Sequence, residues 1–170
     1  MRGSQGLARA AQVQRKARRK RAPRPRKNAD VIAGVALTPW LEHMAGLQAF
    51  GGDDSRLTDH LPKLHVRRAS TKPRRRLAFA DYERHLIHIT DYPGITPADA
   101  LETLLHEVVH LSGLELRHHD GRFKRMLARA ALECFGVDCR AAVKGPVYAL
   151  DVAIVEALQA RPTPTLPEEP

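Results

Sequence analysis

The stretch LETLLHEVVHLSGLELRHHDGRFKRML, residues 101–127, predicts two helices in succession. Apolar side chains recur at the spacing of one helix face in its first half, at Leu101, Leu104, Leu105, Val108 and Leu111. Just upstream, Thr96, Pro97 and Asp99 resemble the capping box that begins many helices. Gly113 is typical of a helix end, so we expect the first helix to lie between Thr96 and Gly113.

The second half of the stretch predicts another amphipathic helix. Asp120 can cap its beginning, and Gly136 can end it. Its apolar stripe consists of Phe123, Met126, Leu127, Ala130, Cys134 and Phe135. The loop between the two helices, residues 113–119, is short, so its last residues can fold back onto the first helix.

His106 and His110 are four residues apart in the first predicted helix, so both imidazoles project from the same side. Two imidazoles at this spacing suit a tetrahedral Zn²⁺ with bonds of roughly 2.0–2.1 Å. Glu107 can accept a proton from a water molecule that attacks a carbonyl and pass it to the leaving nitrogen. The pattern HEVVH therefore predicts a zinc site with Glu107 as general base; the alternative is a solvated helix face.

A catalytic zinc site requires a third protein ligand. The spacing of the metzincins would place that ligand at Leu116, which excludes this class. We favour His119, because the short loop can bring it back onto the first helix. His118 is its rival, and Glu133 on the second helix is a further candidate.

The run TLLHEVVHLSGLELRHHDGRFKRML, residues 103–127, resembles the active-site helices of SprT-like (Spartan-type) zinc metalloproteases. The family pattern is HExxH on one helix, a loop, and His-Gly-x-x-Phe at the start of the next helix. Counted back from Phe123, this pattern places its histidine at His119. The glycine is displaced by one position, because Asp120 precedes Gly121, whereas the His-to-Phe spacing is kept.

This resemblance covers about residues 37–140 and is most specific over 105–123. It implies an α+β, zincin-like minimal metalloprotease domain with Zn²⁺ as cofactor. It also implies cleavage of proteins, which some family members cut while the proteins are held on DNA, with DNA binding controlling activity.

Other segments predict the elements of such a domain. Thr38 and Pro39 begin a helix near 39–50, and KLHVRRA (63–69) reads as a strand. RRLAFAD (75–81) and HLIHIT (85–90) predict a hairpin, and a last helix is expected over about 147–160. We thus expect an N-terminal helix, a small three-stranded sheet, two active-site helices and a C-terminal helix. A sheet edge beside the HEVVH helix can hold an extended substrate by strand addition.

The net charge of +9 is concentrated in two basic blocks. Residues 1–27 contain eleven Lys or Arg and no acid, and residues 63–76 contain seven more, again without an acid. Such blocks attract the phosphates of nucleic acid, although a tail that only aids solubility is the alternative. The expected contacts with DNA or RNA are Arg15, Lys16, Arg18, Arg19, Lys20, Arg21, Arg67, Arg68, Lys72, Arg74, Arg75 and Arg76.

Composition predicts three regions: a disordered basic tail over 1–30, one domain over 31–160 and a disordered Pro-rich tail over 161–170. The hydrophobic content of 43% and the lack of a long apolar run argue against a membrane span. No signal peptide is recognised, so we expect a cytoplasmic protein, with association with the nucleoid as a further option. Cys134 and Cys139 are the only cysteines, which indicates neither a disulfide scaffold nor a zinc ribbon.

Three other functions compete with a peptidase. The endoribonucleases that act on ribosomal RNA have a similar histidine motif, but their third histidine would again fall at Leu116. Antirestriction proteins of plasmids and phages tend to use an acidic third ligand, which favours Glu133. A nucleic-acid-binding protein with a structural zinc, or with no metal, is the third alternative. We expect a zinc metallopeptidase acting on proteins on or near nucleic acid, and removal of Glu107 separates it from a binding module.

Overall fold

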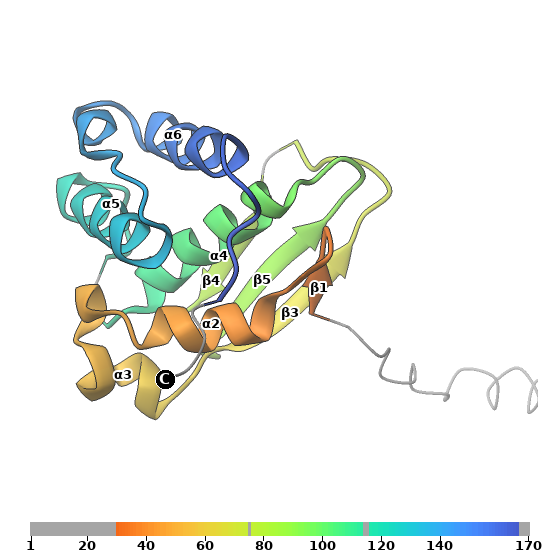
Figure 1. Ribbon diagram of the computed structural model, residues 1–170. Helices are drawn as coiled ribbons and strands as arrows, with labels where there is room; N and C mark the ends of the chain where they lie inside the picture. Colours follow the sequence, from red (N-terminus) through yellow and green to blue (C-terminus); the bar gives the residue numbers. More distant parts are fainter. Residues whose placement is uncertain (1–29, 75, 114–115, 167–170) are drawn as a thin grey trace, which may run out of the picture.

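The computed structural model describes residues 30–74, 76–113 and 116–166, which form a mixed α+β fold (Figure 1). The elements are β1 (Val31–Ile32), β2 (Val35–Ala36), α2 (Leu37–Ala45), η2 (Gln48–Phe50), η3 (Gly52–Asp54), α3 (Arg56–Asp59), β3 (Lys63–Arg68), β4 (Ala78–Asp81), β5 (Leu86–Asp91), α4 (Pro97–Leu111), α5 (Gly121–Phe135), η4 (Arg140–Lys144) and α6 (Val147–Gln159). The elements η2, η3 and η4 are short 3-10 helices. The predicted α+β class is confirmed.

Several predicted features lie outside the described residues. They include residues 1–29 of the basic tail and residues 167–170 of the Pro-rich tail. The expected nucleic-acid contacts among them are Arg15, Lys16, Arg18, Arg19, Lys20, Arg21 and Arg75.

The three-stranded sheet has the strand order β3-β5-β4, with β3 parallel and β4 antiparallel to β5. The predicted hairpin is present as β4 and β5, with residues 82–85 forming its turn. One face of the sheet turns apolar side chains to the helices: Leu64, Val66, Ala78, Ala80, Ile87 and Ile89. Because side chains alternate along a strand, the intervening residues form the opposite face.

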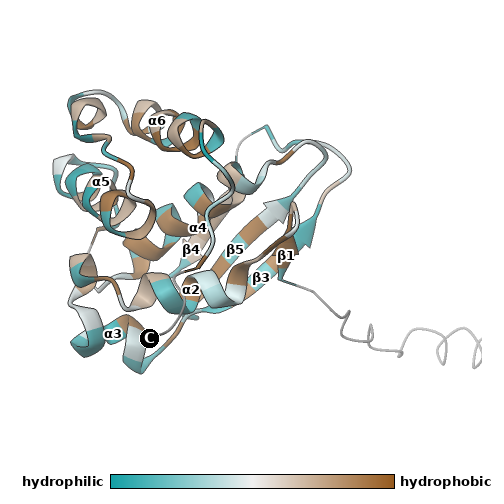
Figure 2. Cartoon of the chain, viewed as in Figure 1, coloured by the Kyte–Doolittle hydropathy of each residue, from teal (hydrophilic) through white to brown (hydrophobic). Residues whose placement is uncertain are grey.

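Helix α4 lies at the centre of the domain. It packs against α2, α5 and α6, and also against β4 and β5. Figure 2 shows hydrophobic residues along α4 and β5, where these elements meet. The predicted capping box begins α4: Thr96 Oγ1 accepts a hydrogen bond from the Asp99 amide, and the Asp99 carboxylate accepts one from the Thr96 amide.

Helix α5 also begins and ends as predicted. The Asp120 carboxylate accepts hydrogen bonds from the amides of Arg122 and Phe123, and Gly136 ends the helix in the left-handed conformation at φ 66°. His119 directly precedes Asp120, so the hydrogen bonds of this cap also fix where the backbone of His119 lies relative to α5.

The N-terminal helix is shorter than expected. It was predicted near 39–50 with Thr38 as its cap, but α2 begins earlier, at Leu37, without a side-chain cap. It ends at Ala45, and the separate turn η2 follows. The physical reason is Glu133 on α5, whose carboxylate accepts hydrogen bonds from the amides of Gln48 and Ala49. This carboxylate caps η2 as an independent unit.

The ribbon β1–β2 was not predicted. Its strands have two residues each, and its turn uses Ala33 and Gly34 at φ 50° and 82°. Strands of this length are too short to show an alternating pattern, although the positive φ values are those of a tight hairpin turn.

The first part of the predicted Pro-rich tail lies against the domain. Arg161 donates a hydrogen bond to the carbonyl oxygen of Gly136, and Leu166 packs against the core. Among the described residues, each helix is too short or too polar to span a lipid bilayer.

Candidate metal centre

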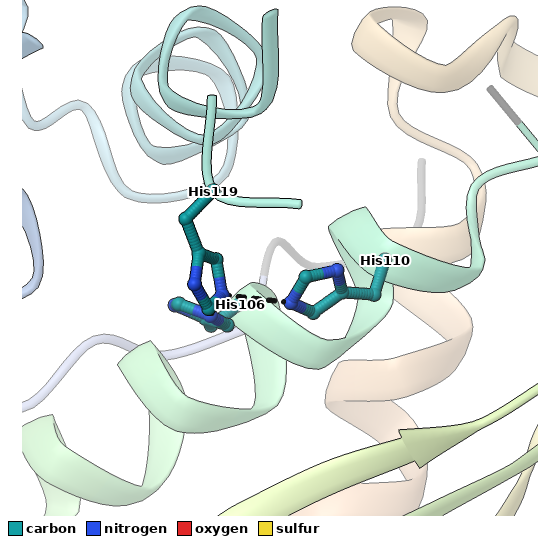
Figure 3. A group of neighbouring side chains, drawn as sticks. All are labelled: His106, His110 and His119. Carbon is teal, nitrogen blue, oxygen red and sulfur yellow. Dashed lines mark hydrogen bonds between the residues drawn. The ribbon is translucent and has the colours of Figure 1, made fainter. Parts of the chain in front are cut away.

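Three histidine side chains converge in front of α4 (Figure 3). His106 and His110 project from the same side of this helix, and His119 reaches them from the segment before α5. The Nε2 atom of His119 lies 2.9 Å from Nε2 of His106 and 3.0 Å from Nε2 of His110. The structure thus brings together the three residues expected as metal ligands.

The other ring nitrogens of the two α4 histidines face hydrogen-bond acceptors. Nδ1 of His106 lies 3.1 Å from Oδ1 of Asp151, and Nδ1 of His110 lies 2.6 Å from the carbonyl oxygen of Leu116. A carboxylate and a carbonyl only accept, so each Nδ1 carries a proton and donates it. In the neutral rings, both Nε2 lone pairs therefore point at the shared centre, as in metal-binding histidines.

The spacing of these nitrogens fits one metal ion. A tetrahedral ion with bonds of about 2.0–2.1 Å holds its ligand nitrogens about 3.3–3.4 Å apart. The separations of 2.9 and 3.0 Å come close to this value, and small side-chain rotations make up the difference. Residues 106, 110 and 119 therefore form a group that can bind a metal ion.

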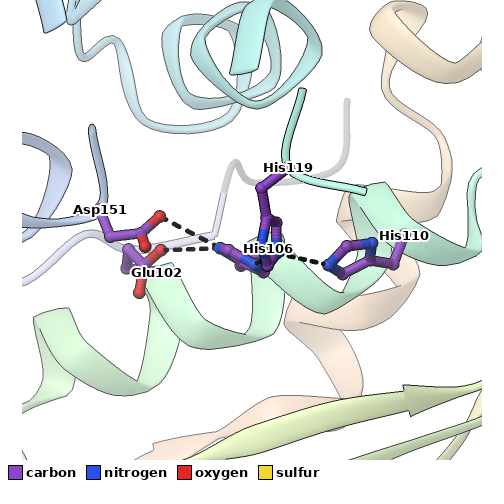
Figure 4. A network of polar contacts seen from close by, with 5 residues as sticks. All are labelled: Glu102, His106, His110, His119 and Asp151. Carbon is purple, nitrogen blue, oxygen red and sulfur yellow. Dashed lines mark hydrogen bonds and ion pairs between the residues drawn. The ribbon is translucent and has the colours of Figure 1, made fainter. Parts of the chain in front are cut away.

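Two carboxylates lie behind His106 (Figure 4). Asp151 comes from α6 and accepts the hydrogen bond from His106, whereas Glu102 lies one turn earlier on α4. The Oε1 atom of Glu102 is 3.7 Å from Nδ1 of His106 and has no hydrogen-bond partner among the described residues. Burial of this carboxyl raises the pKa of Glu102 to about 7, despite its contact with His106.

The three imidazoles differ in their affinity for protons. Burial disfavours the charged form of His106, but the carboxylates of Asp151 and Glu102 outweigh burial and raise the pKa of His106 to about 10. Burial lowers the pKa of His110 to about 4, and burial followed by the charge of His106 also lowers the pKa of His119. At neutral pH, His110 and His119 are therefore uncharged and ready to bind a cation.

Glu107 lies next to this group. Its side chain is buried, and it lines the same cleft as the three histidines. Burial raises the pKa of Glu107 to about 7, although the charge of His106 and the backbone amide of Ala80 act in the opposite direction. A carboxyl group with a pKa near neutrality suits the transfer of a proton in both directions.

The cleft runs between α4 and the edge strand β4, and its volume is about 550 Å³. Arg76, Tyr82 and Arg117 lie along its walls. The Arg117 guanidinium stacks on Tyr82 at 5.0 Å from the ring centroid. Partial burial and the charge of Glu107 raise the pKa of Tyr82, so its hydroxyl stays protonated and can donate a hydrogen bond into the cleft.

Phe123, which lies on α5, packs against the three imidazoles. Its side chain is fully buried, and its ring centroid lies 4.8, 4.4 and 4.8 Å from those of His106, His110 and His119. Because the Phe123 ring contacts all three imidazoles, it restricts their orientation.

The rival third ligands lie elsewhere. His118 is exposed and does not belong to the histidine group found among the described residues. Glu133 caps η2, so its carboxylate is already used there, and it does not belong to the histidine group found among the described residues. Glu133 is therefore not placed to serve as a ligand with the HEVVH histidines.

The basic residues expected to contact nucleic acid are spread over the surface. Arg67, Arg68, Arg74 and Arg76 are exposed. Arg68 forms an ion pair with Asp91 at 3.3 Å, and the Lys72 ammonium lies 5.6 Å from the Tyr92 ring centroid. Arg76 and Glu107 line the same cleft, so one member of the second basic block lies beside the candidate metal centre.

Sequence patterns did not identify Glu102, Asp151, Tyr82 or Arg117 as parts of this site. Glu102 precedes His106 by four residues on α4, so the spacing used for His106 and His110 could also have predicted its contact with His106. The other three depend on tertiary packing. No protein-family model, curated protein or solved structure matches this chain.

Proposed function

We propose that the protein is a zinc-dependent metallopeptidase. The observation that carries this proposal is the convergence of three Nε2 atoms beside a buried glutamate in one cleft. A structural zinc site has four protein ligands, whereas a catalytic site has three and keeps one position open. The histidine group of His106, His110 and His119 fits the second arrangement.

Imidazole nitrogens in a tetrahedral arrangement favour Zn²⁺ among the divalent metals. When bound, zinc supplies Lewis-acid polarisation of the substrate carbonyl and a more acidic water molecule. The carboxylates of Asp151 and Glu102 hold His106 in place and increase its basicity. The hydrogen bond to the Leu116 carbonyl does the same for His110.

Glu107 is the general base in this proposal. Its carboxylate removes a proton from the attacking water and then delivers that proton to the nitrogen of the leaving amine. Its raised pKa of about 7 supports both steps, because neither protonation state is strongly favoured at neutral pH. Tyr82 and Arg117 face the cleft and can stabilise negative charge that develops on the carbonyl oxygen.

The substrate is an extended polypeptide. Among the described residues, strand β4 pairs only with β5, and its other side borders the cleft. A peptide that adds to this edge forms main-chain hydrogen bonds and passes in front of the histidine group. This mode of binding selects an unfolded or flexible segment of a protein rather than a folded surface.

The resemblance of residues 103–127 to SprT-like proteases supports a zincin-like classification and a protein substrate on or near DNA or RNA. The basic residues 1–27, together with the second basic block, provide the charge for such recruitment. A cytoplasmic, nucleoid-associated protease is consistent with this proposal. The Glu133 carboxylate is occupied by the amides of η2, which weighs against Glu133 as the acidic third metal ligand that antirestriction proteins tend to use.

Substitution of Glu107 by Gln tests the function. The variant should retain about one zinc per chain, measured by elemental analysis, and lose at least about 100-fold of its peptidase activity. The substrate is a basic DNA-binding protein, offered with and without DNA. Glu156→Gln, a change on the exposed face of α6, serves as the matched control.

Two results would contradict the proposal. One is a wild-type chain that stays free of zinc after equilibration with the metal. The other is zinc-loaded protein that cleaves no protein substrate, which would favour a zinc-containing binding protein. A Glu107→Gln variant as active as the wild type would exclude Glu107 as the general base.

A further inference from the structure

The outer face of the sheet, opposite the helices, carries aromatic and basic side chains. The inward side chains of β3 and β5 pack against the core, and they are Leu64, Val66, Ile87 and Ile89. The alternation along each strand therefore turns His65 and His88 outward. Phe79 on β4 lies between the inward residues Ala78 and Ala80 and points the same way.

These three rings form one row across the sheet. The strand register pairs His65 with His88 and His88 with Phe79. The Phe79 and His88 rings are stacked, with centroids 4.2 Å apart and an angle of 15° between their planes. His65 meets His88 edge-on, with their Nδ1 atoms 2.9 Å apart. Forty per cent of Phe79 remains exposed, so the row presents aromatic surface to solvent.

Positive charges border this row. Lys63 and Arg67 flank His65 along β3, and both are exposed. Within the described part of the chain, neither forms an ion pair. The carboxylate of Asp81, which lies near the row, is offset by Arg84 at 3.9 Å. The outer face thus combines exposed rings with uncompensated cations.

The two imidazoles of the row share one hydrogen bond, so at least one of them is neutral. Burial and the charge of His65 lower the pKa of His88, with Arg84 acting in the same direction and Asp81 in the opposite one. A neutral imidazole stacked on Phe79 supplies ring surface rather than a third cation.

We propose that the outer face of the sheet binds single-stranded nucleic acid, with bases stacked on the Phe79–His88 pair and phosphates bound by Lys63 and Arg67. Only unpaired bases expose their faces for stacking, which favours single strands over duplexes. The cations complement the phosphates of the same strand. An acidic polypeptide would use the cations but leave the exposed rings without a partner.

The same face adjoins the metal centre. Phe79 lies on the edge strand β4 and also borders the cleft that contains Glu107. A strand bound on the outer face therefore passes beside the peptide site, which suits the cleavage of proteins attached to that strand. This last consequence rests on the proposed peptidase function, whereas binding itself does not.

Fluorescence anisotropy of a labelled oligothymidylate with the full chain tests the proposal. Phe79→Ala should weaken binding about tenfold, because each base–aromatic stack contributes substantially to affinity. Tyr148→Ala, which removes a 68% exposed aromatic side chain from α6, should leave binding unchanged. Phe79→Trp should restore it. The loss caused by Phe79→Ala should disappear on an abasic strand of equal length, which keeps the phosphates and lacks the bases.

Three outcomes would overturn the proposal. They are equal binding by wild type and Phe79→Ala, an equal loss on normal and abasic strands, and displacement of the oligonucleotide by polyglutamate in a Phe79-dependent manner. Thermal unfolding verifies that each variant is folded, and Phe79→Leu replaces Phe79→Ala if the latter is not. Glu107→Gln should bind the oligonucleotide like the wild type, so a failure of the peptidase proposal is distinguishable from a failure of this one.

Discussion

Asp151 is the residue that links α6 to the candidate metal centre. Its carboxylate accepts a hydrogen bond from Nδ1 of His106, and it is the strongest reason for the raised pKa of that imidazole. A protonated His106 cannot offer its Nε2 lone pair to a metal. Metal binding must therefore displace a proton from His106 throughout the neutral pH range.

We expect zinc binding to release about one proton from His106 at pH 8. His106 is protonated below its pKa of about 10 in the metal-free chain, so the logarithm of zinc affinity should rise by about one per pH unit from pH 7 to 9. In Asp151→Asn, the pKa of His106 falls, and this slope should flatten. Calorimetry in buffers of different ionisation enthalpy measures the released protons.

Glu156→Gln, on the same helix, is the control and should release as many protons as the wild type. An equal slope in Asp151→Asn and wild type would show that Asp151 does not govern the basicity of His106.

The histidine pair was predictable from the sequence, because four-residue spacing on a helix fixes which side chains share a side. His119 required a loop that folds back, which the short spacer before Asp120 favours. Asp151 could not be found in this way. It follows His106 by 45 residues, and no local pattern specifies which side of α6 faces α4.

At the scale of the elements, the caps of α4 and α5 were reliable sequence signals, whereas Thr38 did not cap α2. Thr96 and Asp99 begin α4, and Asp120 and Gly136 bound α5. The caps of these two helices are recognisable from the sequence, because each cap forms hydrogen bonds with backbone groups only a few residues away. The end of α2 is different: it depends on Glu133, which is 84 residues from Ala49, so the predicted helix ran too long.

We expect Thr96→Ala to lower the free energy of unfolding by about 1 kcal/mol, the usual effect of removing a side-chain cap. Thr96 Oγ1 accepts a hydrogen bond from the Asp99 amide at 3.1 Å, which alanine cannot replace. Urea unfolding of the metal-free protein should show a lower midpoint with an unchanged slope.

Thr103 lies in the interior of the same helix and provides the comparison. Thr103→Ala should not lower the midpoint, since alanine has the higher helix propensity. Equal midpoints for Thr96→Ala and wild type would mean that the capping box contributes little to stability.

At the scale of the whole molecule, positive charge is unevenly distributed. Residues 1–27 carry eleven Lys or Arg, and the sheet face adds Lys63 and Arg67. In the proposed complex with nucleic acid, the first group would act through charge alone, because it contains no aromatic residue. The sheet face would combine charge with stacking. Sequence composition revealed both basic blocks, but the row of rings depends on strand register, which composition does not encode.

Deletion of residues 1–27 should reduce affinity for oligothymidylate and make its salt dependence shallower by up to about 8 units of slope. Each phosphate neutralised on a single strand contributes about 0.7 to that slope, and eleven cations are removed. Anisotropy titrations at several salt concentrations measure the change. In the shortened chain, Phe79→Ala should still weaken affinity about tenfold. A salt dependence that the deletion leaves unchanged would show that residues 1–27 do not contact the oligonucleotide.

The position of α6 has a consequence for synthesis of the chain. A ribosome-bound fragment that stops before residue 147 already contains all three imidazoles and Glu107, yet it lacks the carboxylate that orients His106. Such a fragment should hold metal poorly. Under the proposed peptidase function, hydrolysis would begin only after α6 has docked, and neighbouring nascent polypeptides would not be cleaved before that point.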